Sequence, residues 1–210
     1  MAMQWLAQII MAKKRLGILG GAFDPIHNGH LALAMHCLQA YALDAIYFIP
    51  TQTPILKEVC VAKPWQRAAM IALAISQHKY FYLDTRELTR DSPSYALLTL
   101  QSLQETDNQA EWIWILGEDA FNDFTKWYRW QEIAHCCDLL VVPRNLAMLA
   151  ITAQPIVEAC FVQAGHAVHY SSMPCVDIAS RVIRAAANLS VGSLPQSVRH
   201  FIVENHLYGF

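Results

Sequence analysis

The chain has 210 residues, of which 55% are hydrophobic and 15% charged, and its formal net charge is −2 at pH 7. These values exclude a disordered chain, and the lack of a long basic run argues against a surface for nucleic acid or anionic membranes. A chain of this length can bury one large core, so we expect it to fold without disulfides or a structural metal.

The six cysteines include no Cys-x-x-Cys pair, so the sequence predicts no zinc site. We expect buried, reduced thiols in a cytoplasmic protein. Residues 1–14 form a short apolar stretch followed by positive residues, which suits neither a signal peptide nor a membrane span. We interpret them as an N-terminal extension to one domain over residues 15–210, with Met1 and Met11 both open as the start.

Short β-rich runs alternate with helical stretches along the chain. The expected strands are Arg15–Gly20, Ala45–Ile49, Tyr80–Asp84, Glu111–Leu116, Leu139–Val142 and Ala167–Tyr170. The expected helices are His30–Tyr41, Trp65–Ser76, Tyr95–Glu105, Trp130–His135, one within Ala153–Gln163, Ile178–Ala187 and Pro195–Asn205. This alternation predicts an α/β protein, with a Rossmann-like, doubly wound, mostly parallel sheet and helices on both faces. Functional residues are then expected directly after the strands, at their carboxyl ends.

The loop after the first strand, residues 20–30, reads GGAFDPIHNGH. Gly20 and Gly21 permit a tight turn and close approach of the backbone to a ligand, and Pro25 stiffens the loop. The next helix would turn its free N–H groups and positive dipole end toward a phosphate. His27 and His30 can point at one spot if the helix starts between them. Two surface histidines in a turn are the alternative, but the number of specified residues in one loop argues against it.

This loop resembles the Gly-x-Phe-x-Pro-x-His-x-Gly-His signature of a nucleotidyltransferase superfamily, which includes the nicotinate-nucleotide and pantetheine-phosphate adenylyltransferases. It is neither a Walker A loop nor a Gly-x-Gly-x-x-Gly fingerprint. The resemblance implies a catalytic, phosphate-holding role for His27 and His30. It also implies ATP contacts at Gly20, Gly21 and Phe23.

From about residue 14 to the carboxyl terminus, the order and spacing of motifs resemble the bacterial nicotinate-nucleotide adenylyltransferases. Gly117 and Asp119 resemble a Gly-x-Asp segment that contacts the nucleotide, although Asp119 could instead cap the next helix. Lys57 resembles a phosphate-binding residue. Its loop departs from the family pattern at Ile55 and Leu56, which replace a proline and a histidine.

Ser180 and Arg184 resemble residues of an Ile-Ser-Ser-Thr-x-Ile-Arg segment, and the resemblance implies that they bind ATP. A hydroxyl, an arginine and free N–H groups at a helix start can converge on phosphate. Ala179 and Arg181 depart from the pattern, so one hydroxyl contact is absent. The last helices, over residues 178–205, would then complete the ATP site.

The resemblance assigns the pyridine nucleotide to four residues: Tyr95, Trp127, Tyr128 and Arg144. An aromatic ring can stack on the flat base, and backbone N–H groups beside it can bind the carboxylate. Core packing is the alternative for Trp127. Ala96 replaces a family threonine, which removes any contact made by that hydroxyl.

The resemblance implies an enzyme of NAD biosynthesis that makes nicotinate adenine dinucleotide and pyrophosphate from ATP and nicotinate mononucleotide. Mg²⁺ would bind through the ATP phosphates, with no protein ligands to a metal expected. The alternatives are nicotinamide mononucleotide or pantetheine phosphate as the acceptor, or a nucleotide-binding protein without catalysis. A dehydrogenase is disfavoured because the first turn lacks its glycine spacing. Neither nucleic acid nor membrane is expected as a partner, and a homo-oligomer stays open.

Overall fold

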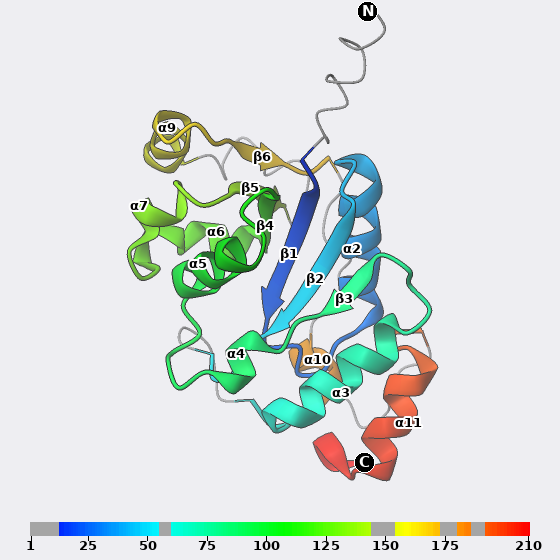
Figure 1. The fold of residues 1–210 in the computed structure, drawn as a ribbon. Helices are drawn as coiled ribbons and strands as arrows, with labels where there is room; N and C mark the ends of the chain where they lie inside the picture. The colour runs from blue at the N-terminus through cyan, green and yellow to red at the C-terminus, as the bar shows by residue number, and fades with distance from the viewer. Residues whose placement is uncertain (1–12, 55–59, 144–153, 173–179, 186–191) are drawn as a thin grey trace, which may run out of the picture.

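The computed structural model describes residues 13–54, 60–143, 154–172, 180–185 and 192–210. Its centre is a six-stranded sheet in the order β3-β2-β1-β4-β5-β6 (Figure 1). All neighbouring strands run parallel. The strands are β1 (Arg15–Gly21), β2 (Ala45–Pro50), β3 (Phe81–Leu83), β4 (Glu111–Gly117), β5 (Asp138–Val142) and β6 (Val168–Tyr170). The strand order reverses between β1 and β4, which makes this a doubly wound, Rossmann-like sheet with its switch point there.

The helices follow the strands as the sequence predicts. They are α2 (Asn28–Ala40), α3 (Pro64–Ile75), α4 (Arg86–Thr89), α5 (Ala96–Thr106), α6 (Glu118–Asn122), α7 (Trp130–Ile133), α9 (Pro155–Gln163), α10 (Ser180–Ala185) and α11 (Gln196–Glu204), with short 3₁₀ turns η1 (Phe124–Lys126) and η3 (Leu207–Gly209). Each predicted strand and helix is present, with ends that shift by one or two residues; the predicted ends of the Ile178–Ala187 helix lie outside the described residues. The short α4 and α6 and the two 3₁₀ turns were not predicted, because pieces this short carry no periodic pattern.

The side chains of each central strand alternate between two cores. On β1, Leu16 and Ile18 face the core that is covered by α5, α6, α7 and α9. Leu19 faces the opposite core, which is covered by α2, α3, α10 and α11. β4 alternates in the same way, with Trp114 in the first core and Ile115 in the second. Both faces of the sheet are therefore buried, which accounts for the apolar composition.

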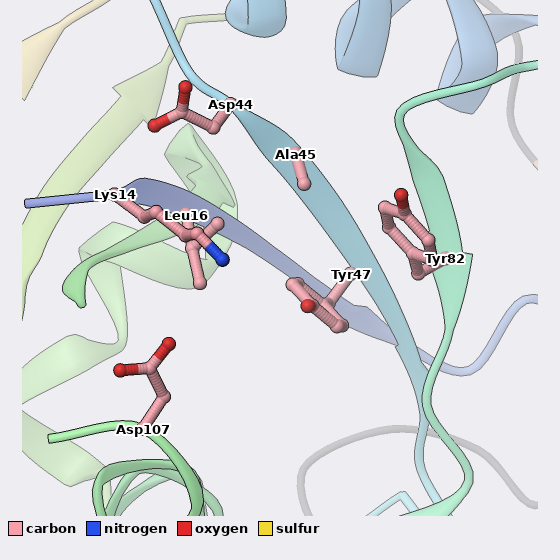
Figure 2. Close-up of a pocket in the computed structure, with 7 residues that line it drawn as sticks. All are labelled: Lys14, Leu16, Asp44, Ala45, Tyr47, Tyr82 and Asp107. Carbon is pink, nitrogen blue, oxygen red and sulfur yellow. The ribbon is translucent and has the colours of Figure 1, made fainter. Parts of the chain in front are cut away.

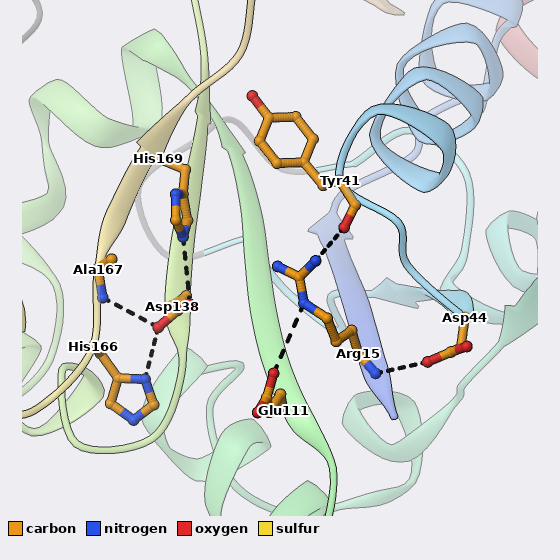
Figure 3. Close-up of polar contacts among 8 residues, drawn as sticks. All are labelled: Arg15, Tyr41, Asp44, Glu111, Asp138, His166, Ala167 and His169. Carbon is orange, nitrogen blue, oxygen red and sulfur yellow. Dashed lines mark hydrogen bonds and ion pairs between the residues drawn. The ribbon is translucent and has the colours of Figure 1, made fainter. Parts of the chain in front are cut away.

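Polar contacts hold the amino ends of the strands (Figure 3). The Arg15 guanidinium donates to the Tyr41 carbonyl and lies 3.8 Å from Glu111, while the Arg15 backbone N–H donates to Asp44 at 2.8 Å. At the neighbouring strand, Asp138 accepts the Ala167 N–H at 3.1 Å and contacts two histidine rings, those of His166 and His169. These histidines therefore contact the amino end of β5, whereas the predicted site lies at the carboxyl ends of the strands.

Five of the cysteines lie in the described residues, and all five are free thiols. Cys37 and Cys137 are buried as expected, but Cys60, Cys136 and Cys160 are only partly buried. Burial raises the pKa of the Cys137 thiol well above its usual value. None of the helices that the structure describes is both long and apolar enough to cross a membrane.

Candidate active site at the histidine loop

The histidine loop, residues 22–27, joins the carboxyl end of β1 to α2. In Figure 1 the arrowheads of β1 and β2 point to the end of the molecule where α10 lies. α2 begins at Asn28 with His27 as its N-cap, so the helix starts between the two histidines. Their rings are stacked, with centroids 3.7 Å apart, and the His27 backbone N–H donates to His30 Nδ1 at 3.3 Å. The predicted convergence of the two imidazoles is confirmed.

His27 is buried to 5% exposure, and its Nδ1 has no hydrogen-bond partner in the structure. Burial lowers the pKa of His27 from 6.5 to about 4, because a charged ring would lose hydration without gaining a partner. At neutral pH the ring is therefore uncharged, with one N–H to donate. It lies at the amino end of α2, where the helix dipole favours an anion.

The two glycines before the loop do not form the predicted tight turn, while their ATP contacts stay a prediction. Gly20 and Gly21 are the last residues of β1, and neither has a positive φ. A Cβ at Gly20 would lie 3.0 Å from the Trp114 ring, so this glycine is required by packing rather than by a turn. The residue with the left-handed backbone is Phe23, at φ 49°. Its ring packs edge-on against the His30 ring, with centroids 5.0 Å apart, and so supports that ring.

Arg67, on α3, ties the histidine loop to the loop after β2. Its side chain is fully buried. Its guanidinium donates to the carbonyl oxygens of Ala22 at 2.6 Å, of Thr51 at 2.7 Å and of Gln52 at 3.0 Å. The planar, always charged guanidinium suits such a set of carbonyl acceptors. The carboxyl ends of β1 and β2 are thus held in one fixed arrangement.

The last part of the chain closes around the same loop. Ser180 Oγ donates to the Pro25 carbonyl at 3.0 Å, and Arg184 Nη1 donates to the Asp24 carbonyl at 2.7 Å. The Asn28 N–H donates to the Ser193 carbonyl at 2.9 Å. The structure therefore brings Ser180 and Arg184 to the histidine loop, as the predicted ATP site requires, and shows them in contact with its backbone.

Gly117 and Asp119 lie at the end of β4, beside the switch point. Gly117 is the N-cap of α6, so Asp119, which is exposed in the first turn of that helix, is not its cap. A Cβ at Gly117 would meet nothing within 4 Å, which leaves open space at the strand end. A carboxylate at this position can accept hydrogen bonds from a ribose.

Three of the residues predicted to bind pyridine nucleotide can be located. The Tyr95 and Tyr128 rings are stacked, with centroids 4.4 Å apart and an interplanar angle of 19°. Trp127 is partly buried and packs edge-on against Trp114 at 6.1 Å, as well as against Phe124 at 5.1 Å. These contacts show core packing at Trp127, and its role in binding the pyridine ring stays a prediction. The fourth residue, Arg144, lies outside the described residues, as does the predicted phosphate-binding Lys57.

A separate pocket of about 180 Å³ lies near the amino ends of β1 and β2 (Figure 2). Its lining includes the tyrosines Tyr47 and Tyr82, two carboxylates, Asp44 and Asp107, and one lysine, Lys14. The carboxylates outnumber the lysine, so this pocket disfavours a polyphosphate. Within the described ranges, no group of three or more His, Cys, Asp or Glu side chains is arranged to hold a metal ion.

Comparison with known proteins finds a matching family model and several similar proteins that share one name. The cytidylyltransferase-like family model matches residues 18–186. A protein of Synechococcus sp. (strain JA-3-3Ab), named a probable nicotinate-nucleotide adenylyltransferase, is 32% identical over 93% of this chain and 95% of its own length. The chain belongs to the nicotinate-nucleotide adenylyltransferase family. A family member of the same name from Geobacter metallireducens (strain ATCC 53774 / DSM 7210 / GS-15) is 34% identical over 92% of this chain.

Solved structures support the same fold. The nicotinic acid mononucleotide adenylyltransferase of Plasmodium falciparum, solved in complex with NaAD, has a TM-score of 0.73 and covers 94% of this chain and 98% of its own. The same enzyme complexed with APC has a TM-score of 0.70. Identity is 17% and 16% in these two cases, so they establish the architecture alone.

Sequence reasoning missed three residues that hold the histidine loop: Arg67 as a bridge, Asp24 as a buried acceptor and Tyr208 as its donor. Arg67 carries a usable signal, since it is one charged residue on the buried face of an otherwise apolar helix. Asp24 and Tyr208 carry none, because 184 residues separate them along the chain.

Proposed function

We propose that the chain transfers the adenylyl group of ATP to nicotinate mononucleotide, which gives nicotinate adenine dinucleotide and pyrophosphate. The relatives that cover most of the chain carry the name of this enzyme. The observation in this molecule that carries the proposal is the stacked pair of His27 and His30 at the amino end of α2, in which burial keeps the His27 ring uncharged. It forms a water-poor anion site at the carboxyl end of β1, where doubly wound sheets bind ligands.

The reaction is an in-line displacement at the α-phosphorus. An oxygen of the acceptor phosphate forms a bond to that phosphorus, and the bond to the β-phosphate oxygen breaks as pyrophosphate leaves. The acceptor phosphate is already ionised at neutral pH, so no side chain needs to take a proton. Catalysis then depends on position and on stabilising the growing negative charge, which His27 and His30 supply by donating N–H bonds to phosphate oxygens.

The triphosphate is bound from three directions in this proposal. The amino end of α2 and the two histidines would hold it, together with Ser180 and Arg184 on α10, which contact the backbone of the histidine loop. Lys57, which follows β2 in the sequence, would add a positive charge. Mg²⁺, bound through the phosphates and water, neutralises part of the charge on the polyphosphate when present. Gly117 and Asp119 receive the nucleoside at the end of β4.

The pyridine ring of the acceptor binds at the aromatic group formed by Tyr95, Trp127 and Tyr128. The stacked tyrosine pair offers a flat apolar face that matches a pyridine ring. Arg144 and nearby backbone N–H groups would bind the carboxylate, and this charge separates the acid from the amide. A cytoplasmic location is part of the proposal, and the free thiols among the described cysteines support it.

Pyrophosphate release tests the proposal. We expect release that depends on both ATP and nicotinate mononucleotide, with a higher kcat/KM for the acid than for nicotinamide mononucleotide. A preference for the amide would reassign the acceptor. ATP binding without release with either acceptor would instead identify a nucleotide-binding protein that lacks catalysis.

A further inference from the structure

The buried carboxylate of Asp24, inside the histidine loop, accepts hydrogen bonds from distant parts of the chain, and we call it the Asp24 junction. The residue is 3% exposed. Its Oδ2 accepts the Val61 N–H at 2.8 Å, and its Oδ1 accepts the Ala62 N–H at 3.0 Å and the Tyr208 hydroxyl at 2.7 Å. Arg184 Nη1 lies 3.7 Å from Oδ2. A buried carboxylate needs such partners, since losing one leaves part of its charge uncompensated.

Tyr208 comes from η3, the last turn of the chain. Its backbone is left-handed, at φ 59° and ψ 22°, in the middle of that turn. A bulky residue rarely takes this conformation and keeps it only where its surroundings enforce it. Burial and the Asp24 carboxylate raise the pKa of the Tyr208 hydroxyl, which therefore stays protonated and acts only as a donor here.

The junction is connected to the catalytic rings through the backbone. Asp24 follows Phe23, whose own φ of 49° is left-handed and whose ring supports His30 at 5.0 Å. Its carbonyl oxygen accepts from Arg184, and the next carbonyl, of Pro25, accepts from Ser180. A shift of the Asp24 carboxylate would therefore move the ring beneath His30 together with the loop that ends at His27.

We propose that Tyr208 is a positioning residue for the adenylyl-transfer reaction, and that its hydroxyl fixes Asp24 and through it the geometry of the histidine pair. The inference rests on the proposed function for its catalytic readout. Tyr208 does not reach the reacting atoms in this account and acts only through Asp24. The carboxyl-terminal turn thus becomes part of the active-site scaffold rather than a simple end to the fold.

The test compares Tyr208→Phe with Tyr41→Phe. Both tyrosines pack against the same core and both hydroxyls donate one hydrogen bond, that of Tyr41 to the Tyr170 carbonyl at 3.0 Å. Tyr41 lies roughly 16 Å from His30 along α2, at about 1.5 Å per residue. We expect Tyr208→Phe to lower kcat about tenfold and to change each KM less than about twofold, because a small misplacement at a reacting site is costly. Tyr41→Phe should leave kcat within about twofold of the original protein.

A second readout needs no substrate. The imidazole resonances of His27 and His30, observed by nitrogen NMR, should move in Tyr208→Phe and stay in place in Tyr41→Phe. Assays are run at a temperature well below the lower of the two variants' thermal unfolding midpoints, so that both variants are folded. A kcat unchanged by Tyr208→Phe, or lowered equally by Tyr41→Phe, overturns the inference. If the original protein releases no pyrophosphate, the proposed function fails, and the resonances alone then decide: a shift specific to Tyr208→Phe supports the junction, and unmoved resonances overturn it.

Discussion

His27 makes the folded state sensitive to mild acid. Its pKa is about 4 in the fold, against 6.5 for an ordinary histidine. Between these pH values the His27 ring is protonated in the unfolded chain but not in the native protein. Its contribution to the free energy of unfolding is therefore fully present above pH 6.5 and is lost as the pH falls toward 4. From pH 7 to pH 4.5 this difference in pKa corresponds to about 2.5 kcal/mol of the free energy of unfolding.

The assay is urea unfolding at several values between pH 7 and pH 4.5, with His27→Gln as the variant that cannot titrate. The original protein should lose about 2.5 kcal/mol more than His27→Gln over this range. His200→Gln is the control, because His200 is exposed and pairs with Glu204 on its own helix, at 3.0 Å. Its curve should follow that of the original protein. Parallel curves for the original protein and His27→Gln would refute the assignment of a buried, uncharged ring. A polyphosphate next to His27 should raise the pKa of that ring. ATP binding near pH 6 should therefore be accompanied by proton uptake, which calorimetry in two buffers with different ionisation enthalpies measures.

Three further changes test the scaffold around the loop. Replacing Arg67 by Met keeps its apolar stem but removes charged hydrogen bonds to buried carbonyls, and urea unfolding should show a loss of about 3 kcal/mol. Gly20→Ala places a methyl group 3.0 Å from the Trp114 ring, so thermal and urea unfolding should show a loss of about 1–2 kcal/mol in the free energy of unfolding. Gly117→Ala is the control, because its methyl group would have no neighbour within 4 Å; it should change the free energy of unfolding by less than about 0.5 kcal/mol. Tyr128→Ala removes a stacking ring and should raise KM for the pyridine mononucleotide about fivefold, whereas a comparable rise in KM for ATP would contradict its placement at the acceptor.

Local periodicity and turn residues were sufficient for the architecture. Strands buried on both faces read as continuous apolar runs, and the helices between them show an apolar face, so the parallel sheet follows from the pattern. The convergence of His27 and His30 was also predictable on the condition that the helix starts between them, although the expected helix began at His30. The helix begins at Asn28, and the two rings are stacked.

The reasons behind particular residues were less predictable. Gly20 reads as a turn glycine, but it is required because the Trp114 ring of the neighbouring strand occupies the space beside it. The contact between Asp24 and Tyr208 joins residues 184 positions apart, and no local signal encodes such a pair. Arg67 shows the limit in another form, since its sequence position indicates burial but not which carbonyls it binds. These facts depend on how the elements pack, which the chain specifies only as a whole.

Adenylyl transfer itself is tested most directly by pyrophosphate release with ATP and nicotinate mononucleotide, measured for the original protein and for His30→Ala. The account predicts acceptor-dependent release, and a loss in kcat of at least about a hundredfold in His30→Ala with a much smaller change in acceptor KM, because the ring acts on charge that develops in the transition state. Release that persists at the original rate in His30→Ala would contradict the role given to the histidine pair, and no release from the original protein with any pyridine mononucleotide would contradict the function.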